Sequence, residues 1–218
     1  VTIRGIINRG GEQAAQHAQS LHALFSHIPG LKVVMPSTPY DAKGLLIASI
    51  EDENPVIYMD DRWLYNEVGE VPEEIYSVPI GKGIVRKEGE HVTIVASSYM
   101  VTQALKAAAE LETQKINVEV IDLRTVKPLD EPLLYESVRK TGRLVIADGG
   151  WTTCGLGAEI CALVVSNLFD SLKAPILRVS LPNTPAPASS ALETIYYPKS
   201  DRIVSAVKKL VCGNEAMK

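Results

Sequence analysis

The sequence predicts an α/β protein made of two units, each with a sheet whose strands are mainly parallel. Two observations support this prediction. Strand and helix patterns alternate over both halves of the chain, and the residues between the halves keep no regular period, are rich in charge and include Pro72 and Pro79. We therefore expect a first unit over residues 1–60, a linker over residues 61–79 and a second unit over residues 80–218.

The first unit shows three strand patterns separated by two helix patterns. Leu21, Leu24 and Phe25 recur at helical spacing until Pro29-Gly30 ends the pattern, and Asp41 lies where a first helical turn favours an acidic residue. Strands are expected at 1–3, 31–35 and 56–59, and helices at 21–28 and 40–50. Because strands that alternate with helices pair in parallel through right-handed crossovers, we expect a parallel sheet.

The second unit continues the alternation. Val101, Ala104, Leu105 and Ala108 form one apolar helix face within an alanine-rich segment. Strands are expected at 80–85, 92–97, 118–123, 144–148 and 176–179, and helices at 100–111, 131–141, 156–168 and 200–211. The pattern predicts an open, mainly parallel sheet.

Composition excludes several classes of function. The 218 residues are 46% apolar and 22% charged, which is typical of a globular protein, and the net charge of −4 offers no general attraction for nucleic acid. No apolar run approaches the roughly 20 residues that span a bilayer, and the start of the chain lacks the pattern of a signal peptide. The three cysteines form no C-x-x-C pair, which argues against a disulfide framework and a structural zinc site. We expect a cytoplasmic protein, or one in a mitochondrial or plastid matrix, with neither nucleic-acid nor membrane partners.

Three histidines surround the first predicted helix. His17, His22 and His27 are spaced by five residues, a step that turns a helix by about 140° beyond a full circle, so their rings do not converge on one metal ion. His17 stands between the amides of Gln16 and Gln19, which can orient a ring that gives or takes a proton near neutral pH. A polar histidine packed at a helix start is the alternative. We interpret His22 and His27 as structural.

Four glycines follow the predicted strand that ends at Asp148. Gly149-Gly150 and Gly155-x-Gly157 stand where a phosphate loop would lie, but Ile160 replaces the third glycine of the dinucleotide fingerprint. The pattern favours a tight turn that brings the next helix close to the sheet.

Three segments, taken together, resemble one protein family. They are QHAQSLHALFSHIPGLKVVMPSTPYDAKGLLIASIEDENPVIYMDDRWLY (Gln16 to Tyr65), VIDLRTVKPLD (Val120 to Asp130) and DGGWTTCGLGAEI (Asp148 to Ile160). They are similar to the β subunit of 2-oxo acid dehydrogenase E1 components, within the transketolase-like thiamine diphosphate enzymes. The resemblance implies that residues 1–60 are the C-terminal half of a pyrimidine-binding domain and that residues 80–218 are a transketolase C-terminal domain.

The resemblance also implies an activity and its partners. An E1 component decarboxylates a 2-oxo acid oxidatively and transfers the acyl group to a lipoyl arm, with the cofactor supplying the difficult chemistry. The implied cofactors are thiamine diphosphate with Mg²⁺, held mainly by the partner subunit, and K⁺. The implied partners are an E1 α subunit, a second β subunit and the lipoyl domain of E2.

By the same resemblance, His17 matches the family's active-site histidine and would steady the intermediate or deliver a proton during acyl transfer. The turn at residues 49–54 resembles the family's monovalent-cation loop. Its implied ligands are the carbonyls of Val1, Ser49 and Ile50, together with Asp52 and Asn54. An ordinary solvated acidic turn is the alternative.

Two departures from the family pattern matter. The family's cofactor-binding glutamate lies upstream of the residues matched here, so we expect this polypeptide alone not to turn over substrate. The family's Pro-Asn-Gly run is also replaced within residues 5–11.

Two other functions remain open: another transketolase-like enzyme such as 1-deoxyxylulose-5-phosphate synthase, or a non-catalytic module for assembly and dimerisation.

Overall fold

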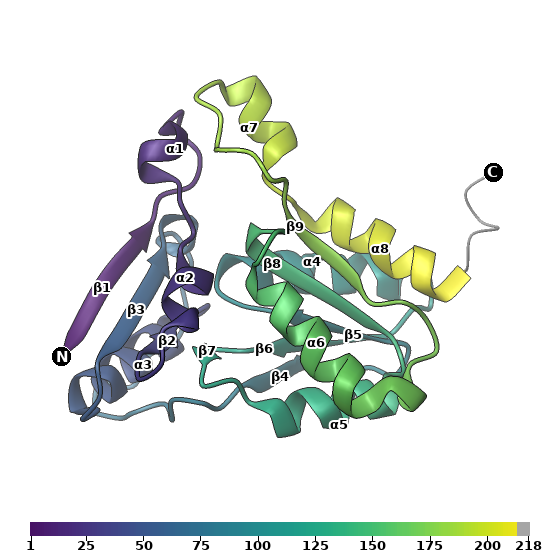
Figure 1. The fold of residues 1–218 in the computed structure, drawn as a ribbon, viewed down its shortest axis with the longest axis horizontal. Helices are drawn as coiled ribbons and strands as arrows, with labels where there is room; N and C mark the ends of the chain where they lie inside the picture. Colours follow the sequence, from purple (N-terminus) through teal and green to yellow (C-terminus); the bar gives the residue numbers. More distant parts are fainter. Residues whose placement is uncertain (213–218) are drawn as a thin grey trace.

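Two sheets organise the chain in a computed structural model that describes residues 1–212 (Figure 1). Residues 213–218, the end of the predicted second unit, lie outside the described part. The first sheet has the order β1 (Thr2–Ile7), β3 (Val56–Asp61), β2 (Lys32–Val34) and β7 (Thr125–Lys127). The second has the order β4 (Ile84–Lys87), β6 (Val118–Asp122), β5 (Val92–Ala96), β8 (Leu144–Trp151) and β9 (Leu177–Leu181).

The first sheet confirms the predicted parallel pairing and adds a strand. β1 and β2 both run parallel to β3, so the carboxyl ends of β1 and β3 meet at one edge. β7 comes from the second half of the sequence and pairs antiparallel with β2. The sequence analysis missed β7 because it has only three residues, set between Arg124, at φ 55°, and Pro128.

The second sheet is parallel except for β4, which pairs antiparallel with β6 at one edge. α4 (Tyr99–Glu112) and α8 (Ser200–Cys212) pack on one face, while α5 (Glu131–Thr141) and α6 (Leu156–Leu168) pack on the other. Successive side chains of β5 point to opposite faces of the sheet. Ile94 packs in the cluster under α4 and α8, and Val95 packs in the cluster under α5 and α6. The prediction of an open, mainly parallel sheet is confirmed.

One hydrophobic core joins the two sheets. Ile7, Ile57 and Met59 of the first sheet belong to the same buried cluster as Ile146 of β8 and Ile160 of α6. Burial of apolar surface is the main stabilising contribution in folding, so this shared cluster holds the two units together.

A buried ionic contact also joins the units. We call it the α3 ion cluster: Asp41, Arg86, Asp122 and Arg124. Asp41 lies in the first turn of α3 (Pro39–Glu51), a helix capped by the side chain of Thr38. Arg86 pairs with both aspartates, at 2.8 Å from Asp122, and Arg124 lies 2.8 Å from Asp41. Both carboxylates are fully buried and both are paired, as buried charges require.

Three short α-helices and two 3-10 helices, η1 (Arg62–Leu64) and η2 (Phe169–Ser171), complete the described fold. α2 (His22–His27) lies where a helix was predicted at residues 21–28, whereas α1 (Ala14–His17) was not predicted, so His17 lies on a different helix from the other two histidines. α7 (Ser190–Tyr196) follows the proline-rich segment and was not predicted. In Figure 1, α1 and α7 project together beyond the ends of the sheets.

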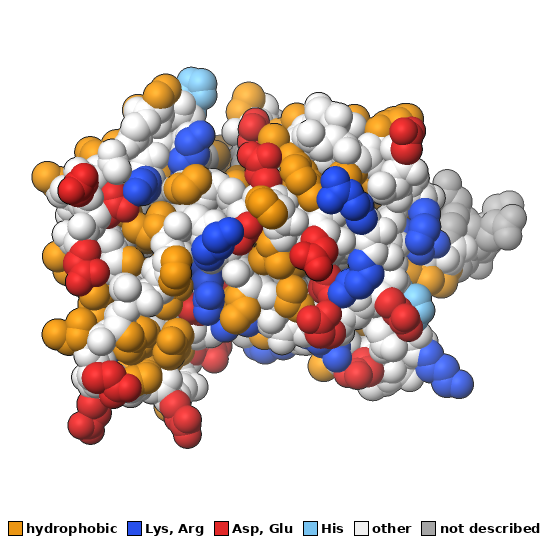
Figure 2. Space-filling view, turned by 90° about the horizontal axis from the view of Figure 1, so that it is seen from below, with side chains coloured by type: hydrophobic (Ala, Val, Ile, Leu, Met, Phe, Trp, Pro, Cys, Tyr) orange, Lys and Arg blue, Asp and Glu red, His pale blue; other side chains and the backbone are white. Residues whose placement is uncertain are grey.

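The surface carries charges of both signs. In Figure 2, basic and acidic side chains are interspersed on the face shown, and no continuous basic surface crosses the described residues there. Within residues 1–212, none of the helices combines the length and the apolar character needed to cross a bilayer.

Candidate active site

His17 ends α1 and is exposed to solvent. Its side chain lines an open hollow of about 490 Å³, together with Arg4 and Ile6 of β1, Asn8, Arg62 and Tyr65. Because β1 and β3 run parallel, Asn8 and Arg62, which follow these strands, meet at the carboxyl edge of the sheet. Ligands of open α/β sheets bind at this edge, so the hollow is the candidate active site.

An ionic network forms one side of the hollow. Arg4 donates to Asp60 through Nη2 at 2.6 Å and Nε at 3.1 Å, and Tyr65 donates its hydroxyl proton to Asp60 at 3.1 Å. The hydrogen bond and the charge of Asp60 raise the pKa of Arg4. Burial and then the charge of Asp60 raise the pKa of Tyr65. Arg4 therefore stays charged and Tyr65 stays protonated at neutral pH.

The segment before His17 has an unusual backbone. Gly10, Gly11, Glu12 and Ala14 all have positive φ, between 53° and 70°. For residues other than glycine, this conformation costs about 1–2 kcal/mol each. The backbone of Glu12 donates to Glu193 of α7 at 3.0 Å, and the carboxylate of Glu12 accepts from Ser190 at 3.2 Å. Contacts with α7 thus hold a strained segment in place.

Local contacts fix the backbone of His17 and leave its ring exposed. The amide of Asn8 donates to the carbonyl of His17 at 3.3 Å, and the next residue, Ala18, is buried in a cluster with Tyr196 and Tyr197. Gln19, which we expected to orient the ring, donates instead to the carbonyl of Ala15 at 3.0 Å.

His22 is buried, in agreement with a structural role. Its Nε2 lies 2.9 Å from Oδ1 of Asp148, and its Nδ1 lies 2.9 Å from the hydroxyl of Ser20. Burial alone would raise the pKa of Asp148, but His22 and the backbone amide of Gly150 together lower it below its usual value. Asp148 is therefore ionised at neutral pH.

The predicted cation ligands lie at the end of α3, just after it, and directly before β1. The hydroxyl of Thr2 donates to the carbonyl of Ser49 at 2.7 Å, and the carbonyl of Val1 accepts from Val56 at 2.9 Å. Each carbonyl oxygen retains a second lone pair, and α3 ends at Glu51, so the carbonyls of its last turn lack helical partners. This oxygen set suits a monovalent cation such as K⁺.

The carboxylate of Asp52 already has its own cation. Lys32 lies 2.5 Å from Oδ2, while the backbone and side-chain amides of Asn54 donate to Oδ1 at 2.9 and 3.1 Å. The hydrogen bond from Lys32 is the main cause that lowers the pKa of Asp52. Lys32 and Asn54 thus already engage the side chain of Asp52, whereas the main-chain carbonyls keep lone pairs that would suit a K⁺ ion.

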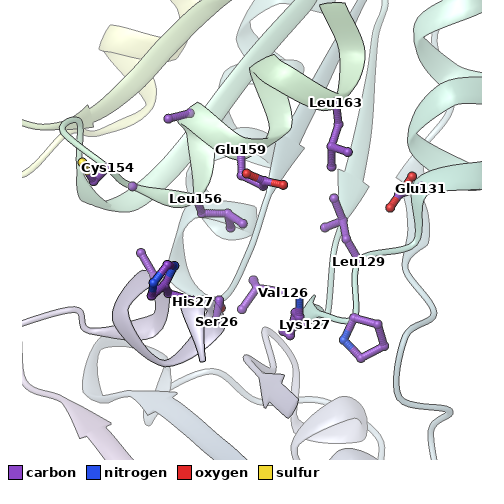
Figure 3. A pocket seen from close by; sticks show the side chains of 14 residues that line it. Ser26, His27, Val126, Lys127, Leu129, Glu131, Cys154, Leu156, Glu159 and Leu163 are labelled. Atoms are coloured by element: carbon purple, nitrogen blue, oxygen red, sulfur yellow. The ribbon is translucent and has the colours of Figure 1, made fainter. Parts of the chain in front are cut away.

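A second cavity of about 530 Å³ lies between α2, β7 and the start of α6 (Figure 3). Leu129, Leu163, His27, Cys154 and Glu159 are among the residues that line it. None of the predicted site residues belongs to this cavity, and it lies away from the carboxyl edge of the first sheet. It is slightly larger than the hollow at His17, and its lining includes the charged side chains of Lys127, Glu131 and Glu159.

The sequence analysis missed five residues of the hollow: Arg4, Ile6, Asn8, Arg62 and Tyr65. The position of Arg62 and Tyr65 directly after a buried strand could have indicated them, because side chains at that edge of a parallel sheet face ligands. Within residues 1–212, no group of three His, Cys, Asp or Glu side chains is arranged to hold a metal ion.

Two family models match the chain. The model of the transketolase pyrimidine binding domain matches residues 1–67, and the model of the transketolase C-terminal domain matches residues 81–203.

Curated proteins and solved structures are also similar. The β subunit of acetoin:2,6-dichlorophenolindophenol oxidoreductase from Bacillus subtilis is 47% identical over 97% of this chain and 62% of its own length. The β subunit of the pyruvate dehydrogenase E1 component from Rickettsia bellii is 45% identical over 96% of this chain and 65% of its own length. A split gene transketolase, solved as an inactive β4 tetramer, superposes with a TM-score of 0.80 at 29% identity, over 97% of this chain and 66% of that one. The chain thus spans less than two thirds of these relatives.

Proposed function

Because this chain belongs to the transketolase-like family of thiamine diphosphate enzymes, we propose that it is a portion of the β subunit of a 2-oxo acid dehydrogenase E1 component. Relatives that are named as β subunits and share 45–47% identity support this assignment. The reaction is the oxidative decarboxylation of a 2-oxo acid, followed by transfer of the acyl group to a lipoyl arm.

The hollow at His17 fits one wall of a cofactor site. It is open to one side, and its lining combines the apolar Ile6, the aromatic Tyr65 and a titratable ring. When bound, thiamine diphosphate supplies the electron sink that a decarboxylation requires. Its diphosphate and Mg²⁺ are assigned to a partner subunit, and the side chains named here would cover the other end of the cofactor.

The exposed ring of His17 is the observation that supports this function best. An imidazole can give or take a proton near neutral pH, and a ring nitrogen that faces an open hollow can exchange a proton with a reacting substrate. Arg62 is exposed at the same hollow, and its positive charge attracts the anionic 2-oxo acid.

Replacement of His17 tests this role. In the full-length β subunit assembled with its α partner, His17→Ala should lower the rate of lipoyl acylation by about 100- to 10,000-fold, the usual contribution of a general acid or base. The affinity for thiamine diphosphate, measured by calorimetry, should stay unchanged. His27→Ala is the matched control, because His27 lies outside the hollow.

Two further outcomes would favour the alternative functions. An unchanged rate for His17→Ala with normal assembly would favour the non-catalytic assembly module. Transfer of the two-carbon unit from pyruvate to a triose phosphate, in place of a lipoyl arm, would favour a synthase of the 1-deoxyxylulose-5-phosphate type.

The proposed partners are an E1 α subunit, a second β subunit and the lipoyl domain of E2. The names of the relatives, which are subunits of larger enzymes, support association with other chains, as does the tetrameric neighbour. We place the protein in the bacterial cytoplasm or in an organelle matrix. A mitochondrial relative from Caenorhabditis elegans, 42% identical over 96% of this chain and 61% of its own length, supports the second compartment.

K⁺ is the proposed ion at the end of α3. Its proposed ligands are the carbonyls of Val1, Ser49 and Ile50, together with Asp52 and Asn54. A ligand that binds only the folded state stabilises it, so exchange of K⁺ for the smaller Li⁺ should lower the midpoint of thermal unfolding. Identical midpoints in the two salts at equal ionic strength would contradict the site.

The proposed division is a pyrimidine-binding portion over residues 1–60, a linker over 61–79 and a C-terminal domain over 80–218. The matched ranges 1–67 and 81–203 support it.

A further inference from the structure

We propose that the end of β8 positions the His17 segment, residues 8–21, through a clamp formed by two buried side chains of the first unit. We call this contact the β8 clamp: Arg9 and His22 bound to Asp148 and Gly149. The consequence for catalysis rests on the proposed function of His17, but the clamp itself does not.

Arg9 fixes the start of the segment. Its side chain is 3% exposed, so its charge needs a buried partner. Nε lies 2.5 Å from Oδ2 of Asp61, and Nη1 donates to the carbonyl of Gly149 at 2.7 Å. One guanidinium thus links the His17 segment, the end of β3 and the end of β8.

His22 fixes the end of the segment. The ring is fully buried, and its Nε2 approaches Asp148, the residue before Gly149 on β8. With a proton on Nε2 directed to this carboxylate, Nδ1 accepts from the hydroxyl of Ser20. The segment is therefore held by β8 on both sides of His17.

The glycine pair in β8 makes room for both side chains. A Cβ on Gly149 would lie 2.3 Å from Nη2 of Arg9, and a Cβ on Gly150 would lie 2.8 Å from Cε1 of His22. Neither glycine has a positive φ, so their conformation does not require glycine. The absence of a side chain serves close approach, which gives a physical reason for two adjacent glycines at the end of this strand.

The clamp opposes the strain of the segment. Residues 10–14 include four positive φ angles, and such a backbone persists only where its surroundings determine it. Arg9 lies directly before this stretch and His22 lies beyond His17. Loss of the Arg9 contact or of the His22 contact would let the segment relax, and the imidazole of His17 would then move.

Hydrogen exchange on the assembled full-length subunit tests the clamp. His22→Ala should speed exchange of the amides of residues 8–21 by about tenfold or more, since it breaks a buried contact to a charged group. His22→Gln retains a donor toward Asp148 and should restore slow exchange. His27→Ala, on the same helix, should leave exchange in this segment unchanged.

Steady-state kinetics on the same variants give the second readout. A positioning role predicts a lower kcat for His22→Ala with KM little changed, and recovery in His22→Gln. Unchanged exchange in residues 8–21 of His22→Ala would overturn the clamp whatever the activity. Faster exchange with full activity would support the clamp and contradict the catalytic role of His17. If His22→Ala does not fold, Asp148→Asn, which keeps the shape of the side chain, provides the same comparison.

Discussion

The β8 clamp and the α3 ion cluster both join the two units through buried charges, yet they hold different kinds of structure. The α3 ion cluster connects regular elements: the first turn of α3 with β4 and with the end of β6. The β8 clamp connects the end of a strand with a strained segment that includes only one short helix. The first contact therefore secures the scaffold, whereas the second determines where one side chain lies.

The partners differ as well. In the α3 ion cluster, two arginines neutralise two aspartates. The β8 clamp includes a histidine and a backbone carbonyl. Two similar buried contacts therefore have different roles, because one connects rigid helices and strands and the other holds a strained loop segment.

The largest effect is expected in the α3 ion cluster. Asp41→Ala leaves Arg86 and Arg124 without one of their carboxylates, and an uncompensated buried charge costs about 3–5 kcal/mol. Urea unfolding of the assembled subunit measures the loss. A loss below about 1 kcal/mol would show that solvent reaches the cluster.

A smaller loss of stability is expected for Asp148→Asn in the β8 clamp, on the order of 1.5–3 kcal/mol at neutral pH for a charged hydrogen bond. The lowered pKa of Asp148 gives stability that is complete above roughly pH 4 and is lost as pH falls through the folded-state pKa. The difference between variant and wild type should therefore shrink as the pH falls below roughly 4. A difference that stays constant with pH would contradict an ionised Asp148.

Gly149→Ala should destabilise by about 1–3 kcal/mol, because the new methyl group collides with Arg9 in a well-packed site. Gly69→Ala is the matched control, since its Cβ would meet only Pro39 at ordinary contact distance. If thermal unfolding gave the same stability for the two variants, the position of the Arg9 side chain would not require a glycine at residue 149.

The smallest effect is expected outside both contacts. Glu112→Ala removes the partner of Lys87 in an exposed pair with an N–O distance of 3.0 Å, and such pairs contribute about 0–1 kcal/mol. A larger loss, measured by urea unfolding, would mean that exposed ion pairs in this protein contribute as much to stability as buried ones.

The sequence predicts the regular elements well and the contacts between them poorly. Apolar periodicity is a local signal, so α3, α4 and the central strands lie where expected. β7 and α7 have three and seven residues, too few for a period to emerge. His22 and Asp148 are separated by more than 120 positions, and no local pattern connects them. His17 was singled out by the amides beside it and by the family resemblance; it is exposed, and its catalytic role stays a prediction.

A structure of the assembled enzyme with thiamine diphosphate and Mg²⁺ bound tests the central claim most directly. The account predicts the imidazole of His17 in the cavity between subunits, within hydrogen-bond reach of the reacting group or one water molecule away, about 3–6 Å. Arg9 and His22 should still bind the end of β8. A His17 ring covered by a partner chain on a face remote from the cofactor would contradict the account.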